Sequence, residues 1–197
     1  MDFKIRNCSS VEGVFTVIKM SPYYDEHSLN RIMKSGFRLN IINFNINNSI
    51  KSSKKFFEKK RITLFSISKN LNHQTTINQL KDFENSYDRI KKLGIHEIYC
   101  CALENFINLK SKFESININK IKIIPDEKGI FTKHLGMLTT FSKDENKFES
   151  KNYMAVVTDG IVEKWWEDIQ DYKNNKNRLV SSEMRAENCM EYLYGSE

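Results

Sequence analysis

The sequence predicts an α/β domain in which helices flank a mixed central sheet. Two observations support this prediction. Short β-branched segments alternate with segments of helical periodicity between residues 61 and 124, which is the pattern of parallel strands joined by helices. Beyond them, Asp159 and Gly160 separate two apolar segments, and an Asp-Gly pair in that setting is typical of an antiparallel hairpin.

The composition fits a single globular domain. The chain has 197 residues, of which 40% are hydrophobic and 28% are charged, as in folded soluble proteins. No apolar run approaches the ~20 residues that a membrane helix needs, and residues 1–15 lack the apolar core of a secretion signal. Four scattered cysteines show neither disulfide-scaffold nor metal-site spacing. We therefore expect a cytoplasmic protein with no membrane partner, no metal and no cofactor.

The regular patterns begin after an N-terminal stretch. Residues 1–33 carry only a weak apolar alternation that breaks at Pro22, so we expect them to form an extension. Residues 34–197 form the predicted folded domain. Its first segment, Leu39–Ile46, alternates apolar and polar side chains and predicts a strand or hairpin. The polar segment Asn47–Lys55 then predicts a turn.

The central elements follow from composition and periodicity. Residues 61–67 are β-branched and aromatic between polar stretches, which predicts a buried strand. Residues 72–93 place apolar side chains three or four positions apart, which predicts a helix. Gly94 then stands where a glycine commonly ends a helix. Residues 97–103 repeat the strand composition.

The later elements complete the order. Residues 106–113 predict a helix, with Ile107, Leu109 and Phe113 expected to face inward. Further segments predict a strand at residues 121–124, a short helix at 131–135, a hairpin of 153–157 with 161–165, and a final helix at 181–194 capped by Ser181 or Ser182. Strand, helix, strand, helix, strand, short helix, hairpin and helix is the order of a thioredoxin-like fold.

Four segments resemble the atypical, type II peroxiredoxins of the redoxin superfamily. They are Leu93–Cys100, Ile123–Met137, Tyr153–Val162 and Val180–Leu193, and they fall in family order over residues 60–195. The resemblance implies a thioredoxin-like fold and an intracellular thiol peroxidase. Such an enzyme needs a thiolate that attacks peroxide and becomes a sulfenic acid, with a pKa lowered by a helix N-terminus and a nearby cation.

The residues that the resemblance implies for this chemistry are missing. Laid on the family pattern, Ser68 replaces a proline, Asn72 a threonine and Thr75 the peroxidatic cysteine. Asn152 replaces the active-site arginine, and the adjacent Lys151 lacks the bidentate fork of an arginine. We therefore predict a degenerate active site.

A shift of register does not restore the site. No cysteine lies between Cys8 and Cys100, and no arginine lies between Arg89 and Arg178. A threonine hydroxyl needs a base to become nucleophilic and forms no reducible sulfenic acid. The prediction of a lost thiol peroxidase site therefore holds in every register.

Other residues offer alternatives. Cys100 and Cys101 are the thiols of a predicted core strand, where packing is favoured over redox chemistry. His73 could act as a base in the altered loop, although a solvated residue is favoured. Thr75 and Thr76 are expected to cap the following helix, with small-anion binding as the alternative.

Two surfaces are candidates for partners. The basic residues of segment 54–61 surround Phe56 and Phe57, a mixture that can bind nucleic acid. We favour the interpretation that the phenylalanines anchor the segment and the lysines are solvated, so nucleic acid is not expected. The family resemblance implies a homodimer through Ser68–His73 and Phe131–Phe141.

Three functions are then compatible with the sequence. We favour a non-catalytic binding or scaffolding protein of peroxiredoxin type. The alternative is an antioxidant enzyme that uses a non-standard thiol, Cys100 or Cys101. The third is a nucleic-acid or ligand binder that uses the basic segment and whose binding weakens with salt.

Overall fold

The computed structural model describes residues 35–46, 49–67, 71–140, 148–167 and 184–196, all of which belong to one compact unit, Arg31–Glu197. The predicted extension over residues 1–33 lies outside the described residues. Ser68, Phe141 and the proposed caps Ser181 and Ser182 lie outside them as well.

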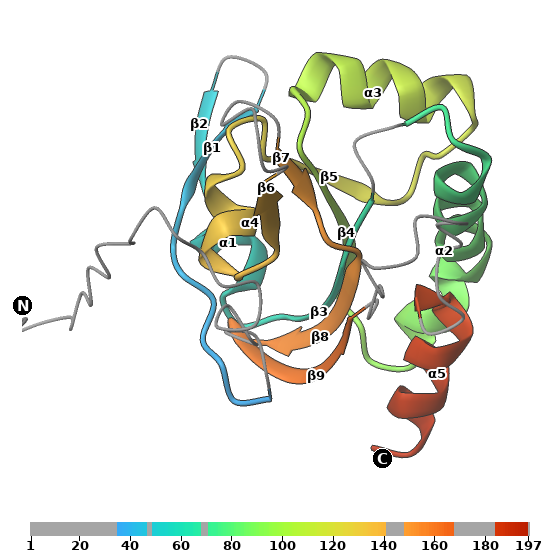
Figure 1. The fold of residues 1–197 in the computed structure, drawn as a ribbon. Helices are drawn as coiled ribbons and strands as arrows, with labels where there is room; N and C mark the ends of the chain where they lie inside the picture. The colour runs from blue at the N-terminus through green and yellow to red at the C-terminus, as the bar shows by residue number, and fades with distance from the viewer. Residues whose placement is uncertain (1–34, 47–48, 68–70, 141–147, 168–183, 197) are drawn as a thin grey trace, which may run out of the picture. The chain divides into compact units, whose positions relative to one another are not determined.

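A five-stranded mixed sheet forms the centre of this unit, with the order β5-β4-β3-β8-β9 (Figure 1). Strand β3 (Arg61–Ser66) pairs in parallel with β4 (Glu97–Ala102), and β4 pairs in parallel with β5 (Lys122–Pro125). On the other side of β3, β8 (Tyr153–Thr158) and β9 (Ile161–Glu167) run antiparallel. The predicted thioredoxin-like arrangement is confirmed.

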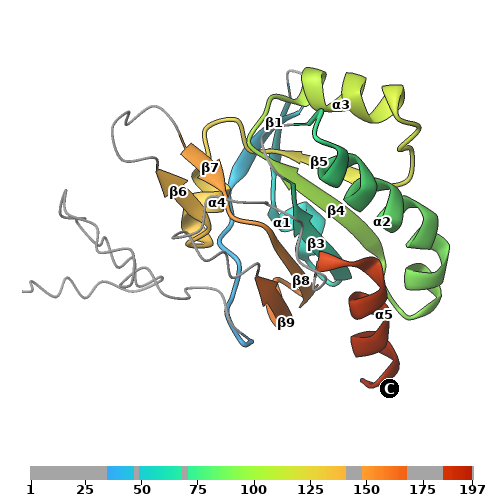
Figure 2. The same ribbon diagram turned by 45° about the vertical axis from the view of Figure 1, so that its right-hand side comes forward.

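Three helices cover one face of the sheet. These are α2 (Gln74–Lys92), α3 (Phe106–Ser115) and α5 (Ala186–Tyr194), and α5 packs beside α2 (Figure 2). Their inward side chains form a hydrophobic cluster with the sheet, in which Phe65 of β3 stacks on Phe83 of α2 with ring centroids 4.1 Å apart. Stacked aromatic pairs of this kind add to the stabilisation that burial gives.

Shorter elements cover the opposite face. A hairpin of β1 (Asn43–Ile46) and β2 (Ser49–Ser52) lies there with the short helices α1 (Lys54–Phe57) and α4 (Ile130–His134) (Figures 1 and 2). Their side chains form a second hydrophobic cluster that includes Phe44, Phe57 and Phe131. A further small hairpin pairs β6 (Leu138–Thr140) with β7 (Phe148–Ser150).

Two sequence-based predictions need correction. Segment Asn47–Lys55 is not wholly a turn, because Ser49–Ser52 pairs with β1 and Lys54 begins α1. In α3, Ile107 is not an inward residue, since its side chain is 73% exposed. Phe106 packs against the second cluster instead, while Leu109 and Phe113 are buried in the first cluster as predicted.

Two positive-φ turns match the sequence signals. Asp159 and Gly160 have φ values of 48° and 74° and join β8 to β9, as a two-residue hairpin turn with two left-handed residues requires. Gly94 has a φ of 83° just after α2, which is the conformation of a glycine that ends a helix.

We expect Gly129→Ala to destabilise the protein by about 1–3 kcal/mol, because left-handed backbone strain and a close contact act together at this position. Gly129 has a φ of 64°, and an added Cβ would lie 2.9 Å from Leu138 Cδ1. Urea unfolding of the full chain measures the change. Gly36→Ala is the matched control, because Gly36 has a φ of 84° and no heavy atom within 4 Å of an added Cβ. Equal losses for both variants would contradict the contribution of the contact.

Candidate functional site

The first turn of α2 is the candidate site, since it follows β3 at the position that the family pattern assigns to the nucleophile. His73 has an extended backbone and is the N-cap residue, and its side chain makes no capping bond. Thr75 is half-buried within the first turn, and Thr76 is buried. The prediction that Thr75 or Thr76 caps this helix is therefore wrong, because both lie after the cap position.

Side chains at this turn bond to one another. The His73 Nδ1 atom lies 2.7 Å from Thr75 Oγ1. Lys112 of α3 donates a hydrogen bond from Nζ to Asn72 Oδ1 at 2.8 Å, which ties α3 to the start of α2. Asn72 and Thr75, which the sequence-based prediction aligns with the family's threonine and cysteine, thus both have side-chain partners. His73 is solvent-exposed, as expected from the sequence.

Asn152 lies at the same end of the sheet as this turn. It stands directly before β8, whose first residues pair with the last residues of β3. The Ser66 hydroxyl bonds to the backbone on both sides of Asn152. It donates to the Lys151 carbonyl oxygen and accepts from the Tyr153 amide, both at 2.9 Å. The structure therefore places Asn152 beside the end of β3.

Lys151, the cation next to Asn152, has an ion-pair partner of its own. Its Nζ forms an ion pair with Glu167 Oε1 at 3.4 Å, and both side chains are partly buried. Glu167 lies opposite Tyr153 in the β8–β9 register, and Tyr153 belongs to the second cluster, away from α2. The Lys151 ammonium is thus held by a carboxylate, and its partner lies on the sheet face away from the start of α2.

The core thiols are buried on opposite faces of β4. Cys100 belongs to the first hydrophobic cluster and Cys101 to the second, and each is 1% exposed. Burial raises the pKa of Cys100 well above its ordinary value. Burial, with Asp126 nearby, raises the pKa of Cys101 even though bonds to Tyr153 and Thr132 oppose the shift. Both shifts favour the protonated thiol over the thiolate.

Cys189 behaves in the same way. It is fully buried in α5, and its sulfur lies 3.4 Å from the Thr63 hydroxyl. Burial raises its pKa to about 11, with Thr63 and Arg61 opposing the shift. Among the described residues, every cysteine is free and buried. The packing role expected for these thiols is therefore consistent with the structure.

A buried carboxylate that the sequence did not single out organises α4. Asp126 accepts hydrogen bonds from the Phe131 amide at 3.1 Å and from both the amide and the hydroxyl of Thr132 at 2.7 Å. Burial raises the pKa of Asp126, although these same bonds lower it. An Asp placed four positions before a short apolar helix was the signal available in the sequence.

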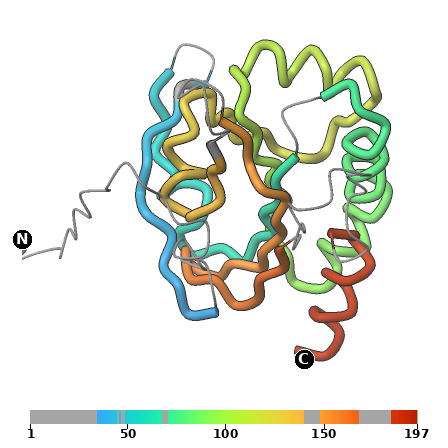
Figure 3. The backbone as a smooth tube through the Cα atoms, in the orientation of Figure 1, coloured from blue at the N-terminus to red at the C-terminus, as the bar shows by residue number. Residues whose placement is uncertain are grey.

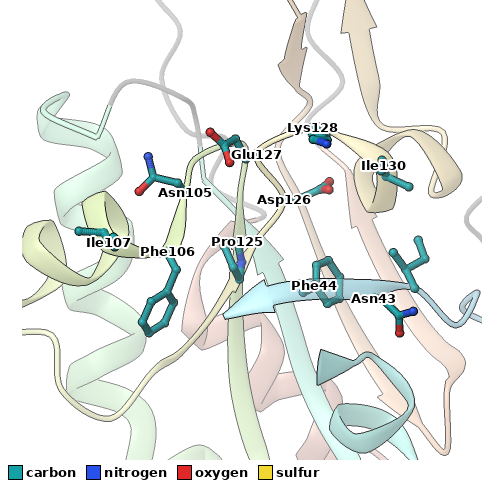
Figure 4. A pocket seen from close by; sticks show the side chains of 11 residues that line it. Asn43, Phe44, Asn105, Phe106, Ile107, Pro125, Asp126, Glu127, Lys128 and Ile130 are labelled. Carbon is teal, nitrogen blue, oxygen red and sulfur yellow. The ribbon is translucent and has the colours of Figure 1, made fainter. Parts of the chain in front are cut away.

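A pocket with a volume of about 400 Å³ opens next to this carboxylate (Figure 4). It lies between β1, the start of α3 and the turn from β5 to α4. Apolar side chains form much of its lining, with amide and charged groups around them; the lining residues are Ile42, Asn43, Phe44, Asn105, Phe106, Ile107, Pro125, Asp126, Glu127, Lys128 and Ile130. Three separate segments build it, which is why the sequence did not reveal it.

Neither a metal centre nor a membrane-spanning helix is present in the part of the chain that the structure describes. Within it, no group of three His, Cys, Asp or Glu side chains is arranged to hold a metal ion. No helix in the same residues is both long and apolar enough to span a bilayer.

Comparison with curated proteins gives clear relatives, although no family model matches the chain. It is 34% identical over 121 residues to "Peroxiredoxin y4vD" of Sinorhizobium fredii and 36% identical over 120 residues to "Peroxiredoxin" of Rhizobium etli. Each match covers 60% of this chain. The chain spans 63% and 66% of the length of these two relatives.

Solved structures show the same fold. Reduced Prx3 from Vibrio vulnificus matches with a TM-score of 0.71 and 18% identity, over 83% of this chain and 99% of that one. The Plasmodium falciparum antioxidant protein, a 1-Cys peroxiredoxin, matches with a TM-score of 0.69 and 24% identity, over the same shares. At these identities the matches establish the fold alone.

We expect a Cys8→Ser variant to show no thiol that reacts with Ellman's reagent while it is folded. The three remaining cysteines are buried and their raised pKa values keep them protonated. Unfolding in guanidinium should make three thiols reactive. The absorbance at 412 nm after reaction with Ellman's reagent counts them. A native thiol that reacts within seconds would contradict the structural role of these cysteines.

Proposed function

The chain belongs to the peroxiredoxin family and has a thioredoxin-like fold, and on this premise we propose that it is a non-catalytic member that serves as a binding or scaffolding module. The observation that carries the proposal is Thr75 in the first turn of α2, where the family pattern requires the nucleophilic cysteine. The cytoplasm is the proposed location, in keeping with free cysteines in a reducing compartment.

The electrostatics of the site support the loss of activity. A peroxidatic thiol depends on a helix N-terminus and a cation that together stabilise its thiolate. Here the helix N-terminus is present, but Asn152 carries no charge and Lys151 is paired with Glu167. Both the nucleophile and the group that would activate it are therefore replaced.

The His73–Thr75 bond does not by itself provide a substitute. A hydroxyl nucleophile needs a base that is in turn oriented by a third group. Within the described residues, no hydrogen bond to the second ring nitrogen of His73 is present. An exposed imidazole without that support is a weak activator.

The alternative function, a peroxidase that uses Cys100 or Cys101, has less support. Both side chains are enclosed by hydrophobic clusters, so peroxide would have to enter the core to reach either sulfur. Their pKa values are raised rather than lowered.

A homodimer is the proposed assembly, through the surfaces expected from the family. The described part of the first surface, Leu71–His73, is half-buried to exposed. The second surface begins at α4, and beside it Ile130 and Ile107 are 46% and 73% exposed at the rim of the pocket. Apolar side chains that remain this exposed gain stability when a partner covers them.

We expect the wild-type chain to consume hydrogen peroxide no faster than dithiothreitol alone, with no sulfenic or sulfinic adduct in its intact mass. The double variant Thr75→Cys/Asn152→Arg should gain a mass adduct that dimedone traps, because the helix N-terminus and His73 then act on a thiol. Thr75→Ser/Asn152→Arg is the control without a thiol. Wild-type turnover that disappears in Cys100→Ser or Cys101→Ser would refute the proposal.

We expect Ile107→Asp/Ile130→Asp to shift the protein from dimer to monomer in sedimentation velocity, since charge then replaces the exposed apolar side chains at the pocket rim beside the second proposed surface. Tyr194→Asp is the matched control. Tyr194 is 64% exposed at the C-terminal end of α5, which belongs to neither proposed surface. A wild-type chain that sediments as a monomer at high concentration would rule out this assembly.

A further inference from the structure

The pocket between β1, the start of α3 and the turn from β5 to α4 has no role in the functions above, although its rim lies beside the proposed dimer surface. Its volume of about 400 Å³ suits a small-molecule site. None of the residues at the start of α2 lines it. The pocket is therefore a candidate ligand site separate from the altered turn.

The apolar wall of the pocket is fixed by packing. Phe44 is 4% exposed, and its ring centroid lies 6.0 Å from that of Phe56 and 5.5 Å from that of Phe131. Pro125, the last residue of β5, is buried, and Phe106 packs against the second cluster. A wall held from behind in this way stays open without a ligand, as in the preformed pockets of binding proteins.

Charged and apolar groups lie on different sides of the pocket. In the view of Figure 4, Asp126, Glu127 and Lys128 lie together above Phe44 and Phe106. A ligand that satisfies both sides has an apolar body and a charged end. The pocket therefore favours an amphipathic molecule over a wholly apolar one.

Carboxylates are in excess on the charged side. Two carboxylates and one ammonium line the pocket, in a chain with a net charge of +6. A further carboxylate lies next to it, because Glu104 Oε1 accepts hydrogen bonds from the backbone amide and the side chain of Asn105 at 2.9 and 3.0 Å. Within the described residues, Asp126, Glu127 and Lys128 form no ion pair. The charged end of a fitting ligand is therefore a cation.

The environment of Asp126 supports this sign of charge. Burial raises its pKa, as happens when a carboxylate is withdrawn from water without a cation beside it. An ammonium group in the pocket would offset part of that effect, since an opposite charge favours the ionised carboxylate. Lys128 is solvent-exposed, so it does not fill this role from within the chain.

We propose that the pocket binds small primary amines with an aromatic or branched apolar body, the ammonium group lying at Asp126 and Glu127 and the apolar body against Phe44 and Phe106. The proposal rests on the binding role proposed above, to which it assigns a ligand class, and not on the absence of peroxide turnover. Binding is reversible, and no covalent bond forms.

An NMR titration of the full chain with matched indoles tests the proposal. Tryptamine, tryptophol and indole-3-propionate share one ring and carry a cation, a neutral hydroxyl and an anion. We expect tryptamine to bind with a Kd of about 0.1–1 mM and to shift the backbone amides of residues 105–107 and 126–130. Tryptophol should bind about fivefold more weakly, and neither indole-3-propionate nor ethylamine should bind at the same concentrations.

Three variants assign the binding to the pocket. Glu127→Gln should weaken tryptamine about threefold and leave tryptophol unchanged, because only the cation senses the lost charge. Phe106→Leu should weaken both ligands alike, since it changes the apolar wall alone. Glu191→Gln is the matched control with unchanged binding, because Glu191 is exposed on α5, across the sheet from β1 and α4 (Figures 1 and 3). Circular dichroism confirms folding of every variant.

Four results would each overturn the proposal: no binding of tryptamine, equal affinity for the three indoles, amide shifts concentrated away from the pocket, or equal losses in the two glutamate variants. Peroxide consumption is measured separately on the same sample. Turnover together with selective tryptamine binding would refute the non-catalytic function and support the ligand class. Absence of both turnover and tryptamine binding would refute the ligand class alone.

Discussion

Burial of β3 and β4 on both faces is the constraint on which the rest of the structure depends. Every residue of β3 after Arg61 and every residue of β4 after Glu97 is buried. Two strands covered on both sides need two separate layers of apolar side chains, and these are supplied by α2, α3 and α5 on one face and by β1, α1 and α4 on the other. The same constraint encloses Cys100 and Cys101 in different clusters, where burial favours the protonated form of each thiol.

The candidate site lies where these layers end. The turn at the start of α2 holds Asn72, His73 and Thr75, whose side chains have local partners, including one from Lys112 of α3. The neighbouring strand start is held by Ser66 through two hydrogen bonds. The elements that would frame a peroxiredoxin site are thus present, and under the proposed function the groups that would bind and activate peroxide are replaced. The proposed role in binding rests on this contrast.

Much of the fold was predictable because its signals are local. The periodicity of residues 72–93 and the Asp159-Gly160 pair each predicted an element that the structure contains. Leu109 and Phe113 of α3 were correctly predicted to face inward, whereas Ile107 was not, because Phe106 meets the second cluster in its place. The pocket and the role of Asp126 were not predictable either. The pocket is built from three separate segments, and the partners of Asp126 depend on where α4 begins.

The ion pair between Lys151 and Glu167 has a consequence for the edge of the central sheet. It joins a residue just before β8 to the last residue of β9, so a side-chain contact adds to the backbone pairing of these two strands. Both side chains are partly buried, and loss of one charge would leave the other without its counterion in a partly desolvated position. The two charges are therefore coupled, and a change at either position acts on the anchoring of the outermost strand.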